Sequence, residues 1–175
     1  MSLRTIMIFP EFKDMDVIDS IRDKFDPLAH LVRPHITLVF PFEMDMSNEE
    51  LSAVLDKRLS DIRAFDLELH GFSRHSDGSG NYLFLDLTKG QDTVRLIHDV
   101  LYANEFKVSD NEYKGSDYLP HMTVGKVETP LILDEAYEEV KDIDMRFSCV
   151  VDKVSVEMIG PNDESIIIIE KRLHP

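Results

Sequence analysis

Apolar residues along the chain recur with two periods, one typical of strands and the other typical of helices. The segment LRTIMIFPEF at 3–12 is predicted to form a strand, and the apolar spacing over 14–25 predicts a helix that ends near Pro27. A second strand is predicted over 34–41. The capping-box sequence SNEE at 47–50 then indicates the start of a second helix. Its apolar stripe comprises Leu51, Val54, Leu55, Leu59 and Ile62.

The rest of the chain contains two hairpins, two helices and one further strand by the same criteria. Predicted strands cover 64–74, 81–90, 119–126, 147–159 and 164–173, and predicted helices cover 91–105 and 133–143. The loop HSDGSG joins the first two of these strands, and GPND joins the last two. Each half of the chain therefore has a strand, a helix and a hairpin in that order, which predicts an α+β fold with an internal duplication.

One short motif, Pro-His-aliphatic-Thr, occurs in both halves. It lies in PHITLVF at 34–40 and in LPHMTVGK at 119–126. Because side chains alternate along a strand, each histidine is expected beside its threonine, with aliphatic residues on the opposite face. The expected His-bearing faces comprise Arg33, His35, Thr37 and Val39 in the first strand and Leu119, His121, Thr123 and Gly125 in the second.

Two such faces, packed against each other across a cleft, suit in-line displacement at phosphorus. A neutral imidazole accepts a proton from the attacking water, and an imidazolium donates one to the leaving oxygen. His35 and His121 are the predicted catalytic pair, because an ordinary histidine pKa near 6.5 supplies both states at neutral pH. Thr37 and Thr123 are predicted to donate hydrogen bonds to the phosphate oxygens. The pattern does not decide which histidine is the base, and the scheme uses no metal or other cofactor.

Composition limits where the protein works and what it contacts. The chain has 175 residues, 43% of them hydrophobic, which suits one domain or two small lobes that share a core. No apolar run is long enough to cross a bilayer, and the N-terminal residues lack the pattern of a secretory signal. A single cysteine excludes an internal disulfide. We expect a cytoplasmic monomer that does not bind membranes.

Net charge narrows the class of substrate. At −15, the protein repels a long polyanion, so we expect no binding to duplex nucleic acid. A small phosphate ester in a locally neutral cleft stays compatible with that charge.

Taken together, the paired motifs and the duplicated order of elements resemble the two-histidine (2H) phosphoesterase superfamily, which includes bacterial 2′-5′ RNA ligase-like proteins and cyclic nucleotide phosphodiesterases. The residues that match are His35-Ile36-Thr37 and His121-Met122-Thr123. The resemblance implies a bilobal fold in which two mostly antiparallel sheets flank a central cleft, with helices outside. We expect one domain over 1–175, with halves at 28–106 and 107–175 and the segment 3–26 completing the second lobe.

The same resemblance implies metal-independent cleavage of a 2′,3′-cyclic phosphate or a related phosphodiester, at an RNA end or on a small nucleotide. Ligase activity also occurs in the family, and nothing in the sequence favours it over hydrolysis. The sequence does not identify the physiological substrate.

Few further residues are candidates for contact with the substrate. Arg33 shares the predicted face of His35, and Arg74, in the first hairpin, is placed to reach across the cleft mouth. Lys126 is expected to point away from His121 if its strand is regular. Candidates to stack on a nucleobase are Tyr82, Tyr113, Tyr118 and Phe42, although aromatic residues in such segments usually belong to the core.

Two other functions use the same residues. A metal-binding protein is the first, but two histidines without spaced cysteines or an evident third histidine make a weak zinc set. The second is a non-catalytic module whose motifs only bind a nucleotide or RNA-end phosphate. Activity that survives a chelator separates the enzyme from the first alternative, and turnover separates it from the second.

Overall fold

The computed structural model describes residues 3–43, 45–102 and 118–175, which form two antiparallel sheets of four strands each. The first sheet has the strand order β2-β1-β7-β8, with β2 at Ile36–Phe42, β1 at Arg4–Ile8, β7 at Lys153–Ile159 and β8 at Ser165–Arg172. The second has the order β5-β4-β3-β6, with β5 at His121–Val127, β4 at Gly80–Lys89, β3 at Phe65–Asp77 and β6 at Phe147–Val151.

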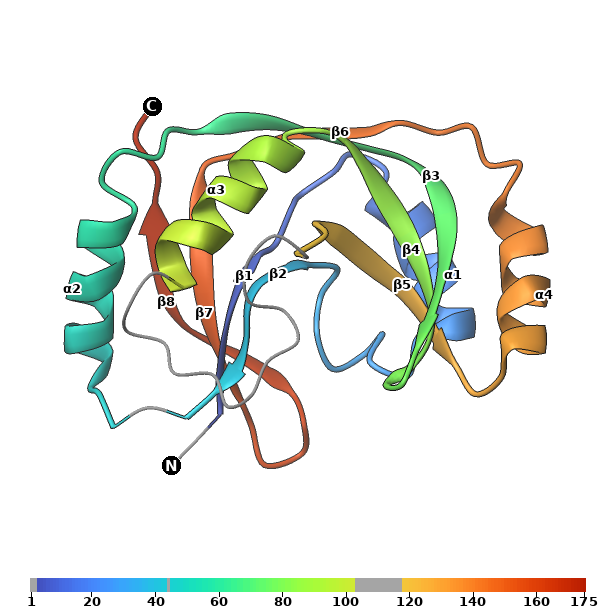
Figure 1. Cartoon of the computed structure of the whole chain (residues 1–175), viewed down its shortest axis with the longest axis horizontal. Helices are drawn as coiled ribbons and strands as arrows, with labels where there is room; N and C mark the ends of the chain where they lie inside the picture. Colours follow the sequence, from blue (N-terminus) through green and yellow to red (C-terminus); the bar gives the residue numbers. More distant parts are fainter. Residues whose placement is uncertain (1–2, 44, 103–117) are drawn as a thin grey trace.

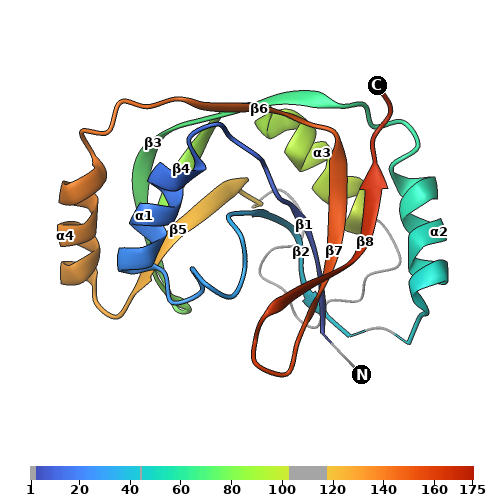
Figure 2. The same cartoon turned by 180° about the vertical axis from the view of Figure 1, so that it is seen from behind.

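Four helices of the described chain lie on the outer sides of these sheets (Figures 1 and 2). They are α1 at Met15–Phe25, α2 at Asn48–Arg58, α3 at Gln91–Tyr102 and α4 at Pro130–Val140. Helix α3 packs on β2 and α2 on β8, whereas α1 packs on β5 and α4 on the second sheet. The expected α+β fold with two antiparallel sheets and outer helices is therefore confirmed.

Each sheet combines strands from distant parts of the chain. In the first, β1 and β2 pair with β7 and β8, and in the second the β3–β4 hairpin pairs with β5 and β6. The expected boundary between the halves at residue 107 lies outside the described residues. The prediction of one strand over 147–159 was wrong: β6 ends at Val151 and pairs with β3, and β7 starts at Lys153 and pairs with β1.

Local signals in the sequence account for the starts of α2 and α4. The predicted capping box is present, because the Ser47 side chain accepts from the Glu50 backbone N–H and the Glu50 side chain accepts from Ser47 N–H. Helix α4 begins at Pro130, earlier than predicted, because the Thr129 side chain caps it and proline suits the first turn. For the helix predicted over 91–105, residues 103–105 lie outside the described chain.

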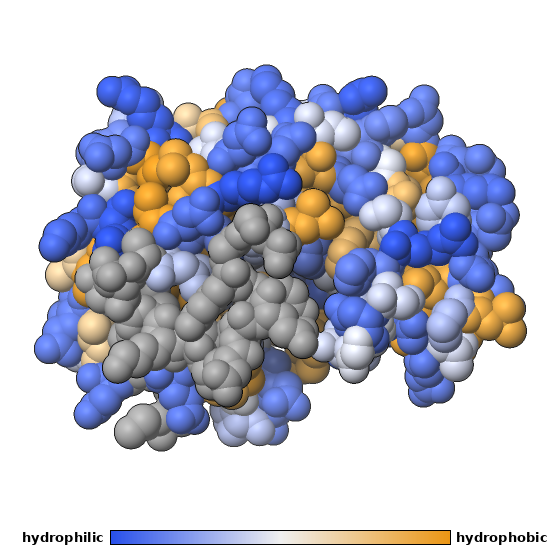
Figure 3. Space-filling model, in the orientation of Figure 1, coloured by the Kyte–Doolittle hydropathy of each residue, from blue (hydrophilic) through white to orange (hydrophobic). Residues whose placement is uncertain are grey.

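The face of the protein that Figure 3 shows is mostly polar. In the orientation of Figure 1, hydrophilic colours cover most of it and hydrophobic residues form separate patches (Figure 3). No helix in the described ranges has the length and apolar character that a membrane span requires.

Close packing of α1 on β5 holds one of the histidine strands in place. Gly125 of β5 faces Phe25 at the end of α1, and a Cβ atom built on Gly125 would lie 2.9 Å from the Phe25 Cβ and 3.2 Å from the Leu83 Cβ. Only a residue without a side chain permits this approach, so Gly125 sets the distance between helix and strand.

We predict that Gly125→Ala destabilises the protein by about 1–3 kcal/mol, because the added methyl group overpacks this contact. Urea denaturation followed by circular dichroism measures the change in free energy of unfolding. Gly78→Ala is the matched control, because a Cβ at Gly78 meets no atom within 4 Å. Equal stability of the two variants would contradict the predicted tight contact.

Candidate active site

The two histidines of the repeated motif make the same local hydrogen bond. His35 Nδ1 lies 2.8 Å from the carbonyl oxygen of Arg33, and His121 Nδ1 lies 2.7 Å from that of Leu119. A carbonyl oxygen only accepts, so Nδ1 is the protonated nitrogen in both rings. Nε2 is therefore the nitrogen of each ring that is left to accept or donate a proton.

A β-bulge follows the threonine in each motif. In the first sheet Met7 pairs with Thr37 while Ile6 pairs with Val39, so Leu38 is an extra residue. In the second sheet, Phe84 pairs with Thr123 and Leu83 pairs with Gly125, so Val124 is an extra residue at the equivalent place. The duplication of the motif thus includes an irregularity of the backbone that its residue types do not reveal.

The bulges correct two predictions of strand alternation. Beyond Thr37 the faces are exchanged, so Val39 lies on the side of Ile6, and Phe40 lines the same two cavities as Thr37. Beyond Thr123, Lys126 pairs with Tyr82, and its Nζ lies 5.5 Å from the centre of the Tyr82 ring. Lys126 therefore points to the cleft side, whereas a regular strand would have turned it away.

Two cavities meet at Thr37. The His35 cavity, of about 340 Å³, is lined among others by His35, Thr37, Phe40, Glu157 and Ser165. The His121 cavity, of about 210 Å³, is lined among others by His121, Thr123, Thr37, Phe40, Tyr82 and Tyr118. Because Thr37 and Phe40 line both, the structure brings the two predicted His-Thr pairs to one continuous cleft between the edge strands β2 and β5, which contact each other.

Burial lowers the pKa of both histidines. The surrounding protein removes water from each imidazolium, which is the main cause of a pKa below 6.5 for His35 and for His121. The hydrogen bond to the carbonyl opposes that shift in each case. The charge of a protonated His121 is a further, smaller cause of the lowered pKa of His35.

A buried ion pair lies near His35. The Arg22 side chain is 1% exposed, and its Nε donates to Asp26 Oδ2 at 2.7 Å. Arg22 lowers the pKa of His35 and Asp26 raises it, so their effects on the imidazole oppose each other. This pair contributes less to the pKa of His35 than burial does.

Aromatic rings extend from His121 towards the tip of the β3–β4 hairpin. The Phe84 ring stacks on His121 with 3.9 Å between centroids and an interplanar angle of 23°, and His75 stacks on Phe84 at 5.6 Å. His75, Asp77 and Phe84 line the His121 cavity beside Tyr82. Sequence patterns did not predict these three residues as part of the site. The pairing of the strands would have identified two of them. Phe84 is the cross-strand partner of Thr123, and His75 is the cross-strand partner of Tyr82.

Tyr118 connects the cleft to the strand that carries the first motif. Its hydroxyl donates to the Thr37 carbonyl oxygen at 2.7 Å, and its ring stacks on His98 at 3.8 Å. His98 is buried, and its Nδ1 lies 2.8 Å from the Leu38 carbonyl oxygen. Tyr118 also lines the His121 cavity, so it is both a wall of the cleft and a brace for β2.

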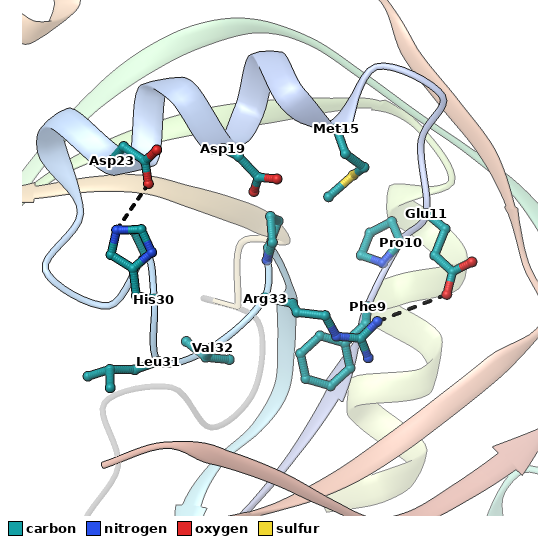
Figure 4. A pocket seen from close by; sticks show the side chains of 12 residues that line it. Phe9, Pro10, Glu11, Met15, Asp19, Asp23, His30, Leu31, Val32 and Arg33 are labelled. Atoms are coloured by element: carbon teal, nitrogen blue, oxygen red, sulfur yellow. Dashed lines mark ion pairs between the residues drawn. The ribbon is translucent and has the colours of Figure 1, made fainter. Parts of the chain in front are cut away.

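The structure places Arg33 in a different cavity from His35. Strand β2 begins only at Ile36, so strand alternation does not extend back to Arg33. The Arg33 guanidinium lies over the Phe9 ring, 4.7 Å from its centre, in a cavity beside α1 (Figure 4). One of its nitrogens is 4.0 Å from a Glu11 carboxylate oxygen.

Arg74 points to the outer face of its sheet. It forms an ion pair with Asp134 of α4, and its guanidinium lies 4.5 Å from the centre of the Tyr137 ring. The neighbouring residue His75 faces the cleft, as alternation along β3 requires. Of the remaining stacking candidates, Phe42 belongs to the core, and Tyr113 lies outside the described residues.

Metal ligands are not grouped in the described chain. Within residues 3–43, 45–102 and 118–175, no three His, Cys, Asp or Glu side chains are placed to hold one ion. The polar side chains that line the cleft include the two imidazoles and the two threonine hydroxyls of the repeated motif.

The fold and the paired His-x-Thr motifs define a two-histidine phosphoesterase-like protein. The family model described as the 2′-5′ RNA ligase superfamily matches residues 9–158, and the chain belongs to this family. A Geobacillus kaustophilus protein named "Putative phosphoesterase GK0864" is 29% identical over 152 residues, which cover 85% of this chain and 83% of that protein.

Two solved structures share the fold. Escherichia coli LigT complexed with 3′-AMP has a TM-score of 0.62 at 13% identity and covers 99% of both chains. Kluyveromyces marxianus Usb1 with uridine monophosphate has a TM-score of 0.59 at 10% identity, covering 98% of this chain and 99% of Usb1.

We predict that Tyr118→Phe lowers the free energy of unfolding by about 0.5–1.5 kcal/mol, because it removes the hydrogen bond to the Thr37 carbonyl. Chemical denaturation measures the loss. Tyr137→Phe is the control, because its ring lies under Arg74 and its hydroxyl has no hydrogen bond within the described ranges. A loss of equal size in both variants would show that the Tyr118 hydroxyl does not brace β2.

Proposed function

We propose that the protein is a metal-independent phosphodiesterase that hydrolyses a 2′,3′-cyclic phosphate, or a related phosphodiester, of a small nucleotide or an RNA end. His35 and His121 act as general acid and base, and Thr37 and Thr123 hold the phosphate oxygens. The observation that carries this function is the pair of imidazoles, each with Nδ1–H held by its own backbone, on a cleft that both threonines line.

Hydrolysis then needs only these side chains and water. The neutral imidazole takes a proton from water at Nε2 as the water oxygen forms a bond to phosphorus. The bond from phosphorus to the 2′ or 3′ oxygen breaks on the opposite side, and Nε2–H of the imidazolium gives that oxygen its proton. The threonine hydroxyls donate to the non-bridging oxygens, where negative charge increases.

Several features favour a small nucleotide over a long RNA. The net charge of −15 opposes the approach of an extended polyanion, and the two cavities together have the size of a nucleotide site. Lys126 supplies a positive charge beside Tyr82, at the end of the cleft that the aromatic rings line. The LigT structure with 3′-AMP and the Usb1 structure with uridine monophosphate, both of the same fold, also contain small nucleotides.

We predict that His35→Gln and His121→Gln each lower kcat for adenosine 2′,3′-cyclic phosphate by about 10²–10⁴-fold, because each removes one proton transfer. Chromatography of the phosphomonoester product measures the rate, and calorimetry measures binding of the substrate. Binding should survive each substitution within about 10-fold, because the other phosphate contacts stay.

The matched control is His30→Gln, because His30 lies in the cavity of Figure 4 beside Asp23, away from the cleft. Its rate should equal that of the wild type, and excess chelator should leave the wild-type rate unchanged. Binding without turnover by the wild type would instead identify a non-catalytic nucleotide-binding module. Loss of activity with the chelator would exclude a metal-independent reaction.

We predict a bell-shaped dependence of kcat/KM on pH with its maximum below pH 6.5. The base must be neutral, so the rate rises above its pKa, and the acid must be protonated, so the rate falls above its pKa. Burial lowers both pKa values in the free enzyme, which moves both limbs to lower pH. Bound phosphate favours imidazolium, so the kcat profile should lie at higher pH than the kcat/KM profile. A flat kcat/KM profile from pH 5 to 9 would contradict the acid–base pair.

A further inference from the structure

The His35 cavity contains a buried carboxyl group that the reaction above does not use. Glu157 of β7 is only 4% exposed and lines this cavity together with Thr5, Asp163 and Ser165. Burial is the main cause of its raised pKa, since the carboxylate loses water there. Burying a carboxyl group costs free energy unless hydrogen-bond donors reach its oxygens. A ligand group that donates a hydrogen bond to Glu157 would therefore be favoured in this cavity.

Strand register fixes the position of Glu157 relative to the phosphate site. Thr37 pairs with Met7 on β1, and Thr5, two residues along β1, pairs with Glu157 on β7. Two inter-strand spacings across the sheet and two residues along β1 place the Cα atoms of Thr37 and Glu157 roughly 12 Å apart. With a phosphate at Thr37, the Glu157 carboxyl therefore lies beyond the phosphate, at a distance that the attached nucleoside can span.

Two hydroxyl groups lie beside this carboxyl, those of Ser165 and Thr5. The Ser165 hydroxyl donates to Glu157 Oε2. The Thr5 hydroxyl is close enough to favour the ionised form of Glu157, but it is buried without an aligned hydrogen bond within the described residues. Thr5 lines the His35 cavity, and its hydroxyl keeps bonding capacity that no described side chain uses with full geometry.

The charge of the lining disfavours a second anion at the Glu157 end of this cavity. Glu157 and Asp163 both line the His35 cavity, and none of its described lining residues is Lys or Arg. At the opposite end of the cleft, Lys126 lies over Tyr82. The cleft is therefore acceptor-rich on the His35 side and has its cation on the His121 side, so its two ends suit different parts of one ligand.

We propose that the His35 cavity binds the 5′-hydroxyl side of a nucleoside 2′,3′-cyclic phosphate, through Glu157, and rejects a 5′-phosphate. This inference rests on the function proposed above. It specifies a substrate with a free 5′-hydroxyl, and therefore a mononucleoside cyclic phosphate, while a longer RNA carries a phosphodiester at that position.

The shape of the ligand supports this orientation. In a nucleoside 2′,3′-cyclic phosphate the base on C1′ lies next to C2′ and the 5′ carbon on C4′ lies next to C3′. Both groups stand on the ring face opposite the phosphate, displaced towards opposite ends of the ribose. With the phosphate at Thr37 and Thr123, a base directed to the aromatic His121 cavity leaves the 5′ carbon directed to the His35 cavity. A 5′-hydroxyl donates to the carboxylate, whereas a 5′-phosphate meets two carboxyl groups.

The test compares adenosine 2′,3′-cyclic phosphate with its 5′-phosphorylated counterpart. For the wild type we expect kcat/KM to be at least about 10-fold higher for the compound with the free 5′-hydroxyl. Glu157→Gln keeps the size of the side chain and an acceptor for Ser165 but removes the charge. In that variant the preference should fall to less than about 3-fold, chiefly because the 5′-phosphorylated compound is used better.

Glu135→Gln is the matched control, because Glu135 is exposed on α4 and the same charge is removed far from the cleft. It should keep the wild-type preference. Equal use of both compounds by the wild type, or an unchanged preference in Glu157→Gln, overturns the inference and leaves the proposed function intact.

Turnover of neither compound refutes the proposed function, and calorimetry with the same two compounds then decides the inference separately. At least about 10-fold weaker binding of the 5′-phosphorylated compound to the wild type, but not to Glu157→Gln, supports the cavity assignment. Equal binding of both compounds, or binding of neither, overturns it.

Discussion

The geometry of the cleft depends on the hydrogen bond between each imidazole and the carbonyl two residues before it. Both accepting carbonyls belong to residues that precede proline, Arg33 before Pro34 and Leu119 before Pro120. A residue before proline is restricted to extended conformations, which limits the directions its carbonyl can take. The proline of the motif thus holds the group that orients the histidine, and no third side chain is needed to fix the tautomer.

Sequence patterns predicted the elements and the paired motifs because these depend on local periods. They did not predict the bulges at Leu38 and Val124, which arise from pairing with β1 and β4 and leave no signature in residue type. A single extra residue exchanges the faces of a strand, which is why Phe40 and Lys126 were expected on the wrong side. Glu157 was missed for a related reason: two strand pairings, remote in sequence, bring it to the cleft.

Under the proposed function, His35 and His121 supply positive charge to the cleft chiefly when a phosphate is bound. Burial lowers the pKa of His35 and His121, so both imidazoles favour the neutral form unless an anion is bound beside them. A bound phosphate reverses this preference by stabilising one imidazolium. Under the proposed mechanism, binding and the appearance of the catalytic acid are therefore the same electrostatic event.

The duplication makes the centre of the cleft symmetric but leaves its two ends different. Each half contributes proline, histidine, threonine and a bulge, so the reaction could run in either direction through the pair. The strands beyond the centre break this equivalence, with His75 and Tyr82 on one side and Thr5 and Glu157 on the other. If a ligand is held by these unlike ends, its orientation decides which oxygen faces which imidazole. The assignment of acid and base then follows from side chains that take no part in the proton transfers.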